Sequence, residues 1–110
     1  MDGALVVEVT GEIDHDTAPA LEQALPTAVN RAHGPCVLDL TSVRFLGAVG
    51  LTVLVNATSH AETQGTPLRI VVDGNRPIIR PIQVMDLDDE LRLYHTVEDA
   101  LHAANQQHRP

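Results

Sequence analysis

The segment that decides the fold is residues 36–51, which read CVLDLTSVRFLGAVGL. Its first five residues alternate between two faces, and this period-two pattern predicts a strand. We expect residues 41–46 to form a short crossing and residues 47–50 a tight turn. A helix is predicted to open at Gly50, because apolar residues then recur at helical spacing as far as Ala61. The segment therefore predicts a strand, a turn and a helix in direct succession.

The turn at residues 47–50 is the first candidate functional site. A helix N-terminus offers unpaired N–H groups and the positive end of the helix dipole, so it is suited to meet a phosphate or a partner. Gly47, Ala48 and Val49 provide no side-chain oxygen to cap this helix, and a missing cap costs about 1 kcal/mol. A local departure of this kind is typical of a functional site.

The composition excludes several classes of function. The chain has 110 residues, of which 44% are apolar and only 2% aromatic, which fits one folded domain with an aliphatic core. So few aromatic rings disfavour a protein that reads nucleic acid by base stacking. The net charge of -8 would be repelled by phosphate backbones and by anionic membranes. A protein partner with basic patches suits this charge, and we expect no nucleic-acid partner.

The sequence also predicts a cytoplasmic location. The lone Cys36 has no internal disulfide partner, fits a reducing compartment and is expected to be a buried strand residue. No apolar run approaches the roughly 20 residues of a membrane helix, so no membrane insertion is expected. The first residues do not carry the positive charge of a signal peptide.

Strand and helix patterns alternate four times along the chain. Strands are predicted over residues 4–10, 36–40, 68–72 and 91–94, with helical patterns after each of them. This alternation predicts an α/β fold in which helices pack on a mostly parallel or mixed four-stranded sheet. Pro26 and Pro81 fall inside helical patterns, so we expect kinks or shortened helices there. We expect a single domain over residues 1–110, with its core in 4–104 and a polar tail in 105–110.

Three motifs follow one another in a characteristic order. Residues 11–14 read Gly-Glu-Ile-Asp, and residues 39–51 read DLTSVRFLGAVGL. The later segments 80–94 and 97–101 complete the series. Together these motifs resemble the STAS domain family, specifically bacterial anti-sigma-factor antagonists, over nearly the whole chain. The resemblance implies a STAS-like fold, and the family often carries an additional N-terminal strand for which this chain starts too late.

The resemblance implies a binding protein and not an enzyme, with no cofactor. In this family the unphosphorylated antagonist binds an anti-sigma factor that is a serine kinase, and a sigma factor is thereby released. The kinase then phosphorylates a serine, and the complex separates. That serine falls on Ala48 here, preceded by Gly47 where aspartate is more familiar. We therefore expect a docking surface that stays permanently unphosphorylated, with Thr52 as the nearest hydroxyl.

Two alternatives remain open from the sequence. The chain is either such an antagonist or one that keeps the fold and binds no kinase. A second function class is a STAS accessory subunit of a membrane transporter, regulating transport and not transcription. The sequence leaves open whether the protein is a monomer or a weak dimer.

The predicted partner-binding residues come from two turns. Asp14 matches the family's turn aspartate, and if the two preceding strands are parallel neighbours, both turns lie at the same end of the sheet. Val49 is expected to face the partner, whereas Phe45 and Leu46 are expected in the core. We expect Asp14→Ala to weaken partner binding and to leave stability nearly unchanged. The full predicted set is Asp14, His15, Gly47, Ala48, Val49, Gly50 and Thr52.

Metal and catalytic sites receive no support from the spacing of polar residues. The six histidines do not pair at the i, i+4 spacing of a helical zinc site. The acidic run at residues 86–90 has no glycine of the kind that a calcium loop needs. Asp14, His15 and Asp16 form the only tight cluster, and a solvated turn explains it better than a metal site.

Overall fold

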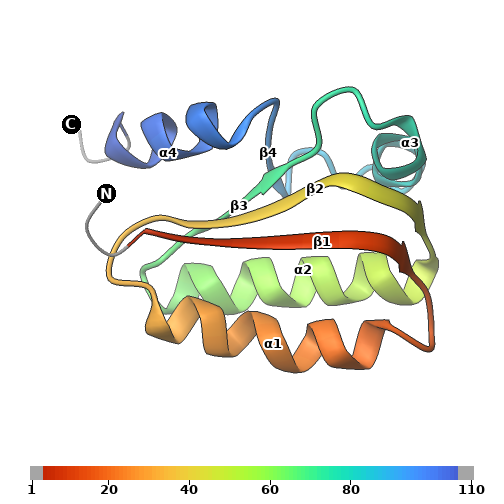
Figure 1. The fold of residues 1–110 in the computed structure, drawn as a ribbon, viewed down its shortest axis with the longest axis horizontal. Helices are drawn as coiled ribbons and strands as arrows, with labels where there is room; N and C mark the ends of the chain where they lie inside the picture. The colour runs from red at the N-terminus through yellow and green to blue at the C-terminus, as the bar shows by residue number, and fades with distance from the viewer. Residues whose placement is uncertain (1–3, 107–110) are drawn as a thin grey trace.

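The computed structural model describes the backbone of residues 4–106 and the side chains of residues 4–103 (Figure 1). Strands and helices alternate throughout, which confirms the predicted α/β class with four strands. The elements are β1 (Leu5–Ile13), α1 (Ala18–Arg31), β2 (Cys36–Leu46), α2 (Ala48–Thr63), β3 (Leu68–Val71), α3 (Arg76–Val84), β4 (Arg92–Tyr94) and α4 (Val97–Gln106).

The sheet has the strand order β1-β2-β3-β4, and all three pairings are parallel. The described strands therefore form a parallel sheet and not the mixed one that the sequence also allowed. The reason is that each strand is followed by a helix that returns the chain to the end of the sheet where the strand began. The next strand therefore runs in the same direction. Helices α1 and α2 cover one face, and α3 and α4 lie on the other (Figure 1).

The core is aliphatic and follows the predicted alternation of β2. Cys36, Leu38 and Leu40 are fully buried in the main cluster. Val37 lies on the opposite face, where it packs with Val71 and with a helix residue of α4 in a smaller cluster. Both faces of β2 are thus covered, as expected for a central parallel strand. Burial raises the pKa of the Cys36 thiol, consistent with its predicted structural role.

Two strands are longer than the sequence predicted. Residues 11–13 extend β1 beyond the predicted residues 4–10, and residues 41–46, expected to form a crossing, belong to β2. The two extensions pair with each other as far as Ile13 opposite Leu46, with two irregularities in register on the way. Gly11, at φ +87°, lies at the second irregularity and adopts a conformation that favours glycine. Mutual pairing, which local pattern does not reveal, makes these segments strands.

Asn75 stabilises the part of β2 that β3 does not reach. The pairing of β2 with β3 ends at Asp39 opposite Val71. Beyond that point the side-chain amide of Asn75 donates to the carbonyl oxygens of Leu40 at 2.9 Å and Val43 at 2.7 Å. Asn75 is the N-cap residue of α3, but it makes no side-chain cap bond to that helix. Its amide instead satisfies backbone acceptors that would otherwise lack a partner in this region.

Several helix expectations need correction. α2 begins at Ala48 and not at Gly50, with Gly47 as its N-cap residue. α1 continues past Pro26, because its buried apolar stripe packs against the sheet on both sides of the proline. α3 ends at Val84, and its C-cap residue Met85 is 60% exposed. α4 extends to Gln106, so only residues 107–110 of the expected tail lie outside the described residues.

Among residues 4–106 no helix is both long and apolar enough to cross a membrane.

Candidate functional site

The turn after β1 and the start of α2 lie side by side at the carboxyl edge of the sheet. β1 and β2 are parallel neighbours, which was the condition for this placement. The two turns are joined directly, because the Gly47 N–H donates to the Ile13 carbonyl oxygen at 2.9 Å. We call residues 14–17 together with Gly47, Ala48, Val49 and Thr52 the rim. Parallel pairing thus gathers six of the seven predicted site residues on one surface, with Gly50 beneath it.

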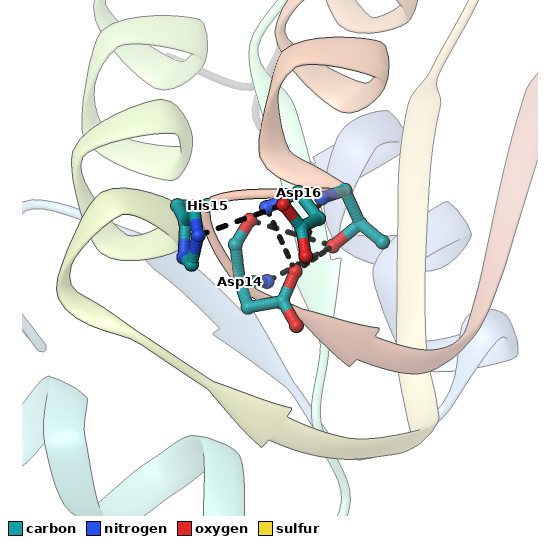
Figure 2. Close-up of polar contacts among 4 residues, drawn as sticks. Asp14, His15 and Asp16 are labelled. Carbon is teal, nitrogen blue, oxygen red and sulfur yellow. Dashed lines mark hydrogen bonds and ion pairs between the residues drawn. The ribbon is translucent and has the colours of Figure 1, made fainter.

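The Asp14 carboxylate organises the first half of the rim. Its Oδ1 accepts the backbone N–H groups of Asp16 at 3.0 Å and Thr17 at 3.1 Å (Figure 2). The Asp14 N–H in turn donates to the Thr17 hydroxyl at 2.9 Å. Such reciprocal bonds fix the turn that leads into α1. Figure 2 also shows His15 beside Asp16, with 3.5 Å between Nε2 and Oδ1, and both side chains are well exposed.

These hydrogen bonds stabilise the ionised form of Asp14. The N–H of Thr17 contributes most, with the N–H of Asp16 adding to it, and together they hold the pKa of Asp14 below its ordinary value. The carboxylate is therefore ionised over the whole physiological range. It places a fixed negative charge next to the N-terminus of α1, where the helix dipole favours it.

Asp14→Ala is expected to lower the unfolding temperature at neutral pH as well as to weaken partner binding. Sequence alone predicted little effect on stability, but the variant loses the acceptor for two backbone N–H groups. Because the folded pKa is depressed, the stabilisation is present above the unfolded pKa and is lost as pH falls through the folded value. The difference between wild type and variant in thermal unfolding should therefore shrink in acid.

Asp16→Ala is the matched control for this experiment, since the Asp16 side chain makes only an exposed contact with His15. It should unfold close to the wild-type temperature. An NMR titration that places the Asp14 pKa at or above its ordinary value would contradict the account of this turn.

The second half of the rim is an uncapped helix start. Gly47 is extended, at φ -84° and ψ 175°, and makes no side-chain cap bond, as the sequence predicted. Ala48 is the first helical residue and is exposed, and Val49 beside it is 47% exposed. The Thr52 hydroxyl is also exposed and donates back to the Ala48 carbonyl oxygen at 3.2 Å. This half of the rim therefore presents methyl groups around unpaired helix N–H groups.

Gly50 lies beneath the rim and not on it. It is buried, and a Cβ added there would lie 2.6 Å from Cγ2 of Ile13 and 2.7 Å from Cδ1 of Leu46. The role that the structure gives Gly50 is to let α2 approach the ends of β1 and β2 closely. It supports the candidate site without offering a surface of its own.

Sequence reasoning missed two apolar contributors to this surface. Phe45, expected in the core, is 50% exposed, and its Cε2 atom would lie 3.2 Å from a Cβ added at Gly47. Leu46 is buried as predicted, so its strand neighbour Phe45 must point the other way. Met85 lines a groove of about 260 Å³ against the rim. The other residues of this groove are Ala48, Leu51, Thr52, Val55, Asn56 and Leu87.

The polar residues near the rim do not form a metal site. Within the part of the chain that the structure describes, no three His, Cys, Asp or Glu side chains gather closely enough to hold a metal ion. The rim thus offers an apolar helix start beside an ordered acidic turn, an arrangement suited to binding another protein surface.

Comparison with known proteins identifies the family. The family model described as the STAS domain matches residues 1–100 of the chain. The chain belongs to the STAS domain family. This STAS domain is 42% identical over 100 residues to the anti-sigma-F factor antagonist RsfB of Mycobacterium tuberculosis, covering 91% of the chain and 80% of that protein.

Solved structures agree with this assignment. The STAS domain is similar to the crystal structure of an anti-sigma factor antagonist from Mycobacterium paratuberculosis, with a TM-score of 0.81 and 42% identity. The match covers 96% of this chain and 88% of that one. A sulfate transporter family protein from Wolinella succinogenes has a TM-score of 0.79 at 19% identity, covering 96% and 88% of the two chains. The latter likeness concerns the fold alone.

Proposed function

We propose that this STAS domain is an anti-sigma factor antagonist that acts in the cytoplasm by binding and not by catalysis. It binds an anti-sigma factor, and the anti-sigma factor then releases the sigma factor that it held. The support is the 42% identity to RsfB over 91% of the chain. The structural observation that carries the proposal is the exposed, uncapped start of α2 at Ala48 and Val49 beside the ordered Asp14 turn.

We further propose that the anti-sigma factor is a serine kinase. This antagonist offers the kinase no hydroxyl to phosphorylate at the first residue of α2. A phosphate on the first residue of α2 would add about two negative charges. The helix dipole would favour these charges, but they would disrupt a packed contact with an apolar or acidic partner surface. Ala48 has no hydroxyl, so this way of ending the complex is absent. The nearby Thr52 hydroxyl lies one turn further along α2 and already donates a hydrogen bond to the Ala48 carbonyl oxygen.

The transporter alternative gains no separate support. The likeness to a sulfate transporter family protein is at 19% identity, where only the fold is shared. The relative at 42% identity is instead an anti-sigma-F factor antagonist, and this difference favours regulation of a sigma factor.

The proposal is tested by capture of partners on the tagged full chain in lysate of its own organism. Mass spectrometry should recover an anti-sigma factor, and the purified pair should then form a complex measurable by calorimetry. The same anti-sigma factor should lose its bound sigma factor when the chain is added. Recovery of a transporter ATPase instead, with no binding to any purified anti-sigma factor, would overturn the proposal.

A further inference from the structure

The outward face of α3 carries charges that work against the stability of the helix. Arg76 is its first residue, where the positive end of the dipole disfavours a cation, and no acidic residue lies in the first turn. Arg80 follows four residues later on the same face, a spacing at which like charges repel. Both side chains line one hollow of about 500 Å³, together with Pro77, Pro81 and Val84. Local helix stability does not explain this choice of residues.

Pro81, Val84 and Met85 are also unfavourable choices for an exposed surface on an isolated helix. Pro81 has no N–H to donate to the carbonyl oxygen of Pro77, so an acceptor is left open in the helix. Val84 is 74% exposed and Met85 is 60% exposed, the highest values among the large hydrophobic residues that the structure describes. An exposed apolar surface bordered by charges is typical of a protein interaction site.

This face is continuous with the rim. Val84 lines the hollow on α3, and its neighbour Met85 lines the groove that also contains Ala48 and Thr52. A partner that covers the rim therefore meets α3 next. The hollow on α3 is lined by two arginines and by no acidic residue, although the chain as a whole has a net charge of -8.

We propose that the α3 face binds an acidic amphipathic helix of the anti-sigma factor, an inference that rests on the function proposed above. Carboxylates one helical turn apart on that helix match the spacing of Arg76 and Arg80, and guanidinium groups pair with carboxylates in two-pronged geometry. An apolar side chain between the carboxylates fills the hollow beside Pro77, Pro81 and Val84. The charges of α3 are thereby neutralised only in the complex.

The test is the affinity of the full chain for the purified anti-sigma factor, measured by calorimetry at two salt concentrations. Arg80→Glu is expected to weaken binding roughly tenfold and to reduce its salt dependence. Arg80→Lys, which keeps the charge, should retain most of the affinity. Arg76→Glu gives the sharpest readout, because it should weaken binding while it raises the unfolding temperature by placing an acid at the start of α3.

Arg31→Glu is the matched control, since it makes the same change in charge on the exposed end of α1, across the sheet from α3 (Figure 1). It should leave the affinity within about twofold of wild type. Unchanged affinity in both α3 charge-reversal variants, with normal binding by wild type, would overturn this inference and leave the proposed function intact.

Two other outcomes would also overturn the inference. If the wild-type chain does not bind the anti-sigma factor, the proposed function and this inference fail together. If Arg80→Glu abolishes binding to vesicles of phosphatidylglycerol and leaves the anti-sigma factor affinity unchanged, the face is a membrane-binding surface instead.

Discussion

Replacing Gly50 by Val is expected to lower the free energy of unfolding by about 3 kcal/mol. A Cβ at this position would lie 2.6 Å from Cγ2 of Ile13, 2.7 Å from Cδ1 of Leu46 and 3.2 Å from the Ile13 carbonyl oxygen. That carbonyl oxygen also accepts the Gly47 N–H, so the backbone cannot move away without losing a hydrogen bond. The start of α2 would have to shift from the sheet. Urea denaturation of the purified chain measures the effect.

Gly74→Val is the matched control, because no atom lies within 4 Å of a Cβ built there. Its effect should stay within about 0.5 kcal/mol, as for most surface substitutions. Equal unfolding midpoints for Gly50→Val and wild type would show that α2 does not approach β1 and β2 as closely as described.

Replacing Ala48 by Asp is expected to weaken binding to the anti-sigma factor by roughly a hundredfold. The substitution places a charge on the exposed first residue of α2, where the proposed complex buries a methyl group. An unpaired charge that must leave water on binding costs several kcal/mol. The same substitution should raise the stability of the free protein, because an acid in the first turn stabilises a helix by about 0.3–1 kcal/mol. Calorimetry and thermal unfolding on one preparation separate the two effects.

Ala24→Asp is the control for this substitution, since Ala24 is also an exposed helical alanine but lies on α1 and lines a different hollow. It should bind like wild type. An Ala48→Asp variant with wild-type affinity would place the docking surface away from the rim.

The sequence was sufficient for the order of the elements but not for the full length of the strands. Alternation within residues 36–40 predicted the buried part of β2, where each side chain has a fixed environment. Residues 41–46 carry no such pattern, and they are held by pairing with β1 and by the Asn75 side chain. These contacts join residues more than 30 positions apart in sequence. No local pattern contains them.

The candidate site was predicted where it depends on local chemistry. The start of α2 is uncapped because no residue there offers a capping oxygen. Ala48 and Val49 are exposed at this helix start. Phe45 was wrongly predicted to lie in the core. An aromatic residue next to a buried leucine is interpreted as a core residue as long as the path of the strand is unknown. Met85 joins this surface from the end of α3, which no motif of the sequence connects with the start of α2. The exposed apolar surface therefore became visible only in the fold.

We propose above that the methyl group of Ala48 leaves the docking surface without an off-switch. The most direct measurement mixes the purified chain and its anti-sigma factor with Mg-ATP and follows both the fraction in complex and the intact mass over time. Wild type should stay bound and unmodified, whereas Ala48→Ser should gain one phosphate and leave the complex. A wild-type chain that acquires phosphate, for example on Thr52, and then dissociates would contradict the claim.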